Sequence, residues 1–292
     1  MDLNAKLQAR ARLYEKVRRY FSGEGLTEVF TPLLSFAGNP DPAIKSFETA
    51  QGYIGDSLNH APMYLQTSPE FFMKRLLVQG SGSIFQICPA FRQAETGRFH
   101  NPEFAMLEWY RVGYNYFDLM SDVSAMIESV TSLKPHVEQI SYARLFEPFG
   151  LNPHSDSHEK IKTAAIQNGI NVQTSVELSR DDWLDLFMTH VIEPSFNPDN
   201  LVFVYDFPAS QASLAKMITD NQGCQVAQRF ELYWQGMELA NGFTELQDAD
   251  EQLQRFKQDN KNRERLGLAS MPLDQNFLDA LKQGLPECSG VA

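Results

Sequence analysis

The chain contains no apolar run close to the roughly 20 residues that a membrane-spanning helix needs. Its first segment, Met1 to Phe21, is charged throughout and contains no signal-peptide core. Only three cysteines occur among 292 residues, far apart and without a CxxC pair, which favours reduced thiols and a cytoplasmic location. P-loop, zinc-protease and dinucleotide-binding signatures are absent, as are repeats and low-complexity tracts. These absences exclude a helical membrane protein and a secreted disulfide scaffold.

Basic residues are also in short supply. The chain has 25 Lys and Arg against 37 Asp and Glu, a net charge of −12. A protein that binds tRNA through its phosphates usually carries a basic patch. The best candidates for one, Arg10 to Arg19 and Lys257 to Arg265, are interspersed with acids and are interpreted as solvated helix faces. The sequence therefore predicts no tRNA partner.

The most informative segment present runs from Phe91 to Tyr110 and predicts two apolar strands joined by a polar loop. The loop is about ten residues long and contains two arginines, a histidine and a carboxylate, whereas ordinary hairpin loops have two to five residues. With period-two alternation, one face of the second strand carries Phe104, Met106, Glu108 and Tyr110. A carboxylate among aromatic side chains indicates a cationic ligand, because charges are rarely buried unpaired. The pattern favours a hairpin that grips an anion over a solvated sheet face with a surface loop.

A second acidic cluster lies between Arg229 and Glu245. Glu231, Glu238 and Glu245 are spaced along apolar strand residues, and Asn241-Gly242 predicts a sharp turn between them. Buried carboxylates need cations, and Mg²⁺ takes one or two carboxylates together with phosphate oxygens. The pattern favours a magnesium site over a hairpin with exposed acids.

The rest of the pattern is mostly helical. Ser68 is expected to cap a helix with Pro69 at its first position. Other expected elements are a helix over 5–22 ended by Gly23 and Gly25, a strand over 27–30, a polar helical region at about 116–192, and strands over 201–205 and 228–234.

Both acidic segments resemble motifs of the class II aminoacyl-tRNA synthetases, and more narrowly those of the lysyl branch. The first segment matches motif 2 through the pattern F-R-x-x-E-x-G-R-x-H-N-P-E-F-x-x-L-E-W-Y, and the second shares the core E-x-x-N-G-F-x-E. The first helix and strand, running into Thr31-Pro32, resemble motif 1, which builds the dimer interface. The resemblance implies an α+β fold with an antiparallel β-sheet flanked by helices. It also implies a homodimer with a single catalytic domain over 1–292, interrupted by a helical insertion at about 116–192.

The resemblance also implies roles for individual residues. The implied ATP-binding residues are Arg92, Glu95, His100, Asn101, Phe104, Glu231, Glu238 and Leu239. The implied substrate-binding residues are Ser68, Glu70, Glu108, Tyr110, Asn241, Phe243 and Glu245. Glu231 and Glu238 would hold Mg²⁺, and Arg92 and Glu238 would be catalytic. Many lysyl synthetases place the loop glutamate where this chain has Ala94, so Glu95 or backbone groups must take its role.

Two further absences refine the expected function. Motif 1 begins within the first thirty residues, which leaves no room before it for an anticodon-binding domain. The resemblance is therefore nearest to a short lysyl-synthetase paralogue that activates lysine or (R)-β-lysine with ATP and attaches it to translation elongation factor P. The third family motif would begin at Cys288, so the sequence is interpreted as part of a longer protein whose missing arginine binds the γ-phosphate. Ala292 stands where lysyl-tRNA synthetases tend to have glycine, and its methyl is hypothesised to reshape the pocket around the α-carbon.

Three alternatives stay open at this point. A catalytic fragment of a lysyl-tRNA synthetase would retain tRNA charging. A non-catalytic paralogue that binds ATP or lysine would account for the absent third motif. An enzyme resembling aspartate–ammonia ligase would need a cation for its substrate side chain, whereas the expected pocket, with Glu70, Glu108 and Glu245, is acidic.

Overall fold

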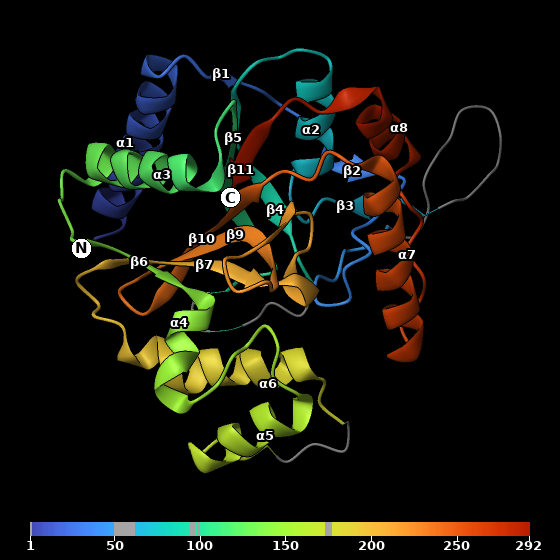
Figure 1. Ribbon diagram of the computed structural model, residues 1–292. Coiled ribbons are helices and arrows are strands. Elements are labelled where there is room, and N and C mark those ends of the chain that lie inside the picture. Colours follow the sequence, from blue (N-terminus) through green and yellow to red (C-terminus); the bar gives the residue numbers. More distant parts are fainter. Residues whose placement is uncertain (1, 50–61, 94–96, 98–99, 173–176) are drawn as a thin grey trace. The chain divides into compact units, whose positions relative to one another are not determined.

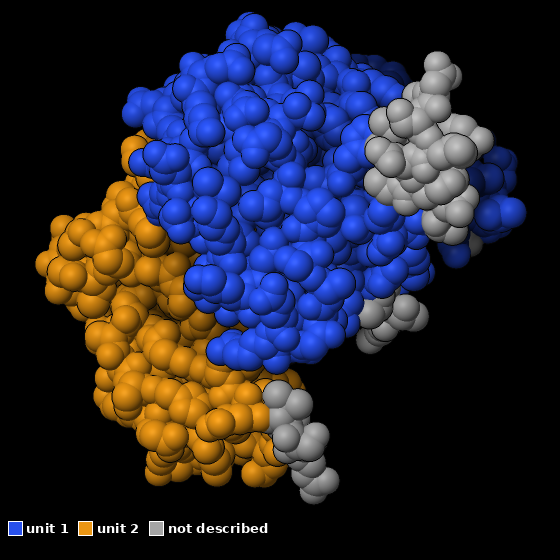
Figure 2. All heavy atoms as spheres, turned by 90° about the vertical axis from the view of Figure 1, so that its right-hand side faces the viewer, with its two compact units in different colours: residues 1–113, 246–290, 292 blue, residues 114–245, 291 orange. Residues whose placement is uncertain are grey.

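The computed structural model describes residues 2–49, 62–93, 97, 100–172 and 177–292. The chain forms an α+β fold (Figure 1) that divides into two compact units (Figure 2). Unit 1 comprises residues 1–113, 246–290 and 292, and unit 2 comprises residues 114–245 and 291. The expectation of a single catalytic domain stays a prediction. Among the residues that the structure describes, no helix combines the length and apolarity that crossing a bilayer requires.

In the part of unit 1 that the structure describes, a sheet is combined with four helices. Its elements are α1 (Leu3–Gly23), β1 (Thr27–Glu28), β2 (Leu34–Ser35), β3 (Tyr64–Leu65), α2 (Glu70–Val78), β4 (Ile84–Phe91), β5 (Glu103–Val112), α7 (Ala249–Arg265), α8 (Gln275–Gly284) and β11 (Cys288–Val291). The strand order is β1-β4-β5-β11, with β1 parallel and β5 antiparallel to β4, while β2 and β3 form a separate antiparallel pair.

Helix α1 covers one face of the unit 1 sheet. It begins after Asp2, whose side chain accepts a hydrogen bond from the Ala5 amide at 2.7 Å. Near its end, the ring of Phe21 packs against those of Phe85 and Trp109, with centroids 4.9 and 5.0 Å away. Burial of this apolar stripe stabilises the helix more than its propensity does. The predicted first helix is therefore confirmed; it begins two residues earlier than predicted and ends one residue later, at Gly23.

The β4–β5 hairpin confirms the predicted alternation. Gln86 lies opposite Glu108 and Ala90 lies opposite Phe104, so these side chains share one face of the pair. Trp109 points to the other face, toward Phe21 of α1. The face that carries Glu108 is thus distinct from the face that α1 covers.

Unit 2 is built around a second group of strands. Its elements are α3 (Tyr116–Thr131), β6 (Val137–Ser141), α4 (Tyr142–Phe146), η1 (Glu147–Phe149), α5 (His158–Gln167), α6 (Arg180–Phe187), η2 (Met188–Ile192), η3 (Glu193–Ser195), β7 (Leu201–Pro208), η4 (Ala209–Gln211), β8 (Met217–Thr219), β9 (Gln225–Trp234) and β10 (Met237–Thr244). The strand order is β10-β9-β7-β6, with β8 paired to β9. All these pairs are antiparallel except β6 with β7.

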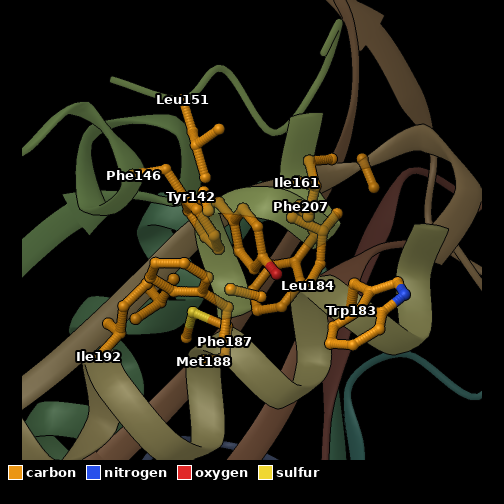
Figure 3. Packing of buried hydrophobic residues seen from close by; sticks show 14 of the residues in the cluster. Tyr142, Phe146, Leu151, Ile161, Trp183, Leu184, Phe187, Met188, Ile192 and Phe207 are labelled. Atoms are coloured by element: carbon orange, nitrogen blue, oxygen red, sulfur yellow. The ribbon is translucent and has the colours of Figure 1, made fainter. Parts of the chain in front are cut away.

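The two faces of the unit 2 strands are covered by different helices (Figure 1). On one face, α3 contacts β9 and β10, and the Phe117 ring meets Tyr205 edge-on at 5.2 Å. On the other face, helices α4, α5 and α6 pack onto the strands through a large hydrophobic cluster (Figure 3). Tyr142, Phe146 and Phe187 lie at its centre and are fully buried. This cluster is the core of the region predicted to be a helical insertion, which also contains the strand β6.

Two local predictions are wrong. The turn between β9 and β10 is made by Gln235-Gly236, both with positive φ, and β10 runs straight through Asn241 and Gly242. Gly242 is required for another reason: a Cβ atom there would lie 2.6 Å from the Phe230 ring. Helix α2 begins at Glu70 with Pro69 at its N-cap and without a side-chain cap bond, so Ser68 is not the cap.

Candidate active site

Arg92 is held at the base of the polar loop in unit 1. Its Nε donates to the carbonyl of Thr67 at 3.2 Å, and its backbone amide donates to the Pro102 carbonyl at 2.9 Å. The guanidinium lies over the ring of Phe104, 5.3 Å from its centroid. A planar cation beside an aromatic face suits a nucleotide, since arginine matches phosphate and an aromatic ring stacks on a base. The structure therefore brings two of the predicted ATP-binding residues together.

Two further described residues of the loop present polar side chains to solvent. His100 and Asn101 are both exposed, and the Gly97 amide donates to the His100 carbonyl at 3.2 Å. Glu95 lies outside the described residues, as does Ala94, so the predicted contact of Glu95 with adenine stays a prediction.

Glu108 is a buried carboxyl group on strand β5 of the β4–β5 hairpin. Its side chain is 3% exposed, and the Tyr110 hydroxyl donates to its Oε1 at 2.7 Å. Burial, and then the charge of Glu108, raises the pKa of the neighbouring Cys88 thiol to about 11. Cys88 therefore stays a neutral thiol, which agrees with the reduced cysteines that the sequence predicts.

Ser68 and Glu70 occupy the segment that leads into α2. Ser68 is half-buried and lines a small pocket together with Gln66 and Asp274. Lys74 donates from Nζ to Glu70 Oε1 at 2.6 Å, and the Lys74 side chain is 1% exposed. Because a buried ammonium offsets its charge, Glu70 contributes less negative potential than the sequence alone implies. The i,i+4 spacing of this pair was the signal that could have revealed Lys74.

In unit 2, each carboxylate oxygen of Glu231 accepts a hydrogen bond from a neighbouring side chain. Arg229 Nη2 donates to its Oε1 at 2.5 Å, and the Tyr233 hydroxyl donates to its Oε2 at 2.5 Å. All three side chains share one face of β9, since they alternate with period two. Burial, followed by the charge of Glu231, raises the pKa of Tyr233, so this hydroxyl remains a donor.

Strand β10 brings the other predicted residues of unit 2 to the same face. Asn241 lies opposite Glu231, Phe243 opposite Arg229, and Glu238 opposite Tyr233. Glu238 and Asn241 are three positions apart, and a regular strand would place them on opposite faces. A β-bulge between Glu238 and Ala240 absorbs one residue, Leu239, and restores the shared face.

Two predicted residues occupy contrasting environments at the ends of this row. Leu239, at the bulge, is 42% exposed. Glu245 is 1% exposed and forms an isolated bridge with Ala215, next to the hydrophobic cluster. A carboxylate buried this deeply matches a small cationic group such as an ammonium.

The carboxylates of unit 2 fit magnesium better than a metal with a full protein cage. No group of three or more His, Cys, Asp or Glu is arranged for a metal within the described part of the chain. Glu231 and Glu238 share one face, and Mg²⁺ bound with a nucleotide needs only one or two carboxylates. The donor set therefore suits a metal whose other ligands come from phosphate and water.

Comparison with known proteins identifies the class to which this geometry belongs. The family model of class II tRNA synthetases (D, K and N) matches residues 1–292, and the chain belongs to this family. Within it, the chain is similar to proteins named elongation factor P–(R)-β-lysine ligase. That of Sodalis glossinidius is 46% identical over 290 residues, which cover 99% of this chain and 88% of the relative. That of Pectobacterium atrosepticum is 45% identical with the same coverage, and that of Salmonella paratyphi B is 44% identical over 288 residues, 98% of this chain and 87% of the relative.

Proposed function

We propose that this chain activates (R)-β-lysine, or lysine, with ATP and transfers it to a lysine side chain of translation elongation factor P. The names of relatives that match almost the whole chain support this function. The observation that carries it is the row of Glu231, Glu238, Asn241 and Phe243 on one face of unit 2, which leads to the buried Glu245. Such a row suits a metal-bound phosphate at one end and an amine at the other.

The first step forms an aminoacyl-adenylate. A carboxylate oxygen of the amino acid attacks the α-phosphorus of ATP, and pyrophosphate leaves. We assign the α-phosphate to Arg92, where its charge stabilises the negative charge that develops on the phosphate oxygens. Phe104 would stack on the adenine, and Glu95, His100 and Asn101 would contact the nucleotide from the loop. The contact between Arg92 and Phe104 supports this assignment.

In unit 2, Glu231 and Glu238 would hold Mg²⁺, with Leu239 beside the nucleotide. When bound, the metal neutralises phosphate charge and favours departure of pyrophosphate. The exposed Glu238 and the buried Glu231 differ in role: Glu231 is oriented by its neighbours, whereas Glu238 is accessible to solvent.

Acidic side chains would select a substrate with two amino groups. We assign the terminal ammonium to Glu245, whose side chain is deeply buried, with Asn241 and Phe243 framing the chain of the amino acid. Further substrate contacts are proposed for Ser68, Glu70, Glu108 and Tyr110. Since Lys74 offsets the charge of Glu70, Glu70 would act chiefly as a hydrogen-bond acceptor.

In the second step the amine of the acceptor lysine attacks the carbonyl carbon of the adenylate. AMP leaves, the amine loses a proton, and an amide bond forms. We expect the acceptor to be elongation factor P rather than tRNA, because the net charge is −12 and basic residues are not clustered.

The test is a pair of assays on the same preparation. Pyrophosphate exchange with ATP should require the amino acid, and labelled (R)-β-lysine should then be transferred to elongation factor P. Total tRNA, assayed in parallel, should remain unlabelled. Labelling of tRNA without labelling of the factor would refute the ligase function in favour of a lysyl-tRNA synthetase. An absence of exchange with every amino acid would support a non-catalytic binding protein.

The proposal includes a homodimer in the cytoplasm. Large apolar side chains are exposed on unit 1, among them Leu3, Leu7, Phe30, Leu34 and Phe36. Leu3 and Leu7 lie on α1, in the segment that resembles motif 1, which supports an interface there. Free cysteines support a reducing compartment. Light scattering after gel filtration should give twice the mass of one chain, and Phe30→Ser should lower it.

A further inference from the structure

Arg229 makes several contacts beside Glu231, one of the candidate metal carboxylates. Its Nη2 donates to Glu231 Oε1 at 2.5 Å, and its Nε donates to Asn241 Oδ1 at 3.1 Å. Its Nη1 donates to the carbonyl of Gln211 at 2.7 Å. The guanidinium also stacks on Phe207, 4.6 Å from the ring centroid. Three nitrogens bonded in different directions, with a ring against one face, fix the plane of the group.

The turn that contacts Arg229 is hydrogen-bonded to helix α6. Gln211 belongs to the short helix η4, and its side chain donates to Asp185 at 2.8 Å. Ser210 donates to Asp181 of the same helix, also at 2.8 Å. Arg229 therefore links the backbone of the turn at 209–211 to the side chain of Asn241 on β10.

We propose that Arg229 is a positioning residue: it orients Glu231 toward Mg²⁺ and at the same time orients Asn241 toward the substrate. This inference rests on the proposed function. It adds a residue that touches neither the metal nor the reacting atoms. By linking both side chains, Arg229 couples the geometry of the metal site to that of the amino-acid site.

The physical reason lies in what a metal-binding carboxylate needs. Glu231 is 8% exposed, so little water is available to hold its rotamer or to balance its charge. Arg229 and Tyr233 each donate to one oxygen, which leaves further lone pairs on both for another partner. Partners that orient a metal ligand in this way typically affect metal affinity by about 10- to 100-fold. Lysine cannot replace the three directed bonds, although it keeps the charge.

The experiment measures nucleotide binding rather than turnover. Binding of a non-hydrolysable ATP analogue to the full chain is followed by calorimetry, with and without MgCl₂, for Arg229→Lys and Arg229→Gln. We expect both variants to need about 10- to 100-fold more Mg²⁺ for half-maximal enhancement of binding. Binding of the analogue without Mg²⁺ should stay within about twofold, because neither variant alters the proposed phosphate contact of Arg92. In the same calorimetric assay, binding of the amino acid should also weaken, because Arg229 no longer orients Asn241.

The matched control is Arg263→Gln. Arg263 is a buried arginine of α7 in unit 1, which donates to the backbone carbonyls of Ala269 and Asp41. Its loss should lower thermal stability without changing the Mg²⁺ requirement. Thermal unfolding of all variants separates a general loss of stability from a specific loss of metal affinity.

The outcomes are distinct. Wild-type protein that binds the analogue equally with and without Mg²⁺ would refute the proposed function, and with it this inference. Mg²⁺-dependent wild-type binding with an unchanged Mg²⁺ requirement in Arg229→Lys would overturn the positioning role alone and leave the proposed function standing. If Arg229→Gln does not fold, Arg229→Lys decides, since it retains the charge beside Glu231.

Discussion

Replacing Gly242 with alanine should damage both stability and substrate binding. The added Cβ would lie 2.6 Å from Cζ and 2.8 Å from Cε1 of Phe230, and 2.8 Å from Cβ of Val291. These separations are far below the 3.5–4.0 Å at which carbon atoms attract. The Phe230 ring is fully buried and Val291 is 2% exposed, so neither can swing into solvent. Since Phe230 lies on one neighbouring strand and Val291 on the other, β10 cannot relieve both contacts by moving to one side, and the surrounding packing must shift.

The cost follows from overpacking. One extra methyl group in a well-packed core typically costs about 1–3 kcal/mol. Gly242 does not have a left-handed φ, so alanine adds no backbone strain and the clash is the only penalty. At roughly 2–4 °C per kcal/mol for chains of 150–250 residues, the melting temperature should fall by about 2–12 °C. The proposed substrate residues Asn241 and Phe243 flank the site, so the KM for the amino acid should rise more than the KM for ATP.

Thermal and urea unfolding measure the first effect, and pyrophosphate exchange at varied amino-acid concentration measures the second. Gly23→Ala is the control: its Cβ would meet nothing within 4 Å, and alanine is favoured at a helical position. Adding Phe230→Leu to Gly242→Ala should recover part of the lost stability. A Gly242→Ala variant as stable as wild type, with an unchanged KM, would refute the close-approach argument.

Three further predictions concern single carboxylates and Arg92. Glu245→Gln should weaken amino-acid binding by about 3–5 kcal/mol, as removal of one member of a buried ion pair does, with ATP binding intact; calorimetry showing unchanged amino-acid affinity would refute the pairing. Arg92→Ala should lower kcat of adenylate formation on the order of 10²- to 10³-fold, whereas a change confined to the KM for ATP would make Arg92 a ground-state anchor. Burial, followed by the charge of Asp41, raises the pKa of Asp259 to about 6, so the fold loses stability as pH rises from about 4 to 6. Asp259→Asn should therefore raise the melting temperature at pH 7.5 but not at pH 4, and equal shifts at both values would exclude this linkage.

The sequence alone predicted those features that depend only on the spacing and order of neighbouring residues. Phe104, Glu108 and Tyr110 alternate with period two in an uninterrupted strand, and the structure places them on one face. The first helix repeats its apolar residues at helical spacing, and Phe21 is buried as expected. The motifs around Arg92 also indicated the family correctly, since the match depends on the order of residue types and not on their coordinates.

Tertiary structure decided the features that depend on a partner strand. Asn241-Gly242 has the composition of a turn, yet Gly242 lies within β10 because the Phe230 ring of β9 leaves no space for a Cβ. Glu238 and Asn241 share a face only because the bulge at Leu239 shifts the register, and a bulge forms between two strands, not within one.

The same reason explains the partners of the charged residues. Arg229 bonds to Glu231 on its own strand, to Asn241 on the next strand, and to the turn at Gln211. Sequence alone determined that these polar groups exist and that buried carboxylates among them need cations. Folding decided which cation each one meets, because hydrogen bonds act over about 3 Å and these partners are up to 18 residues apart along the chain.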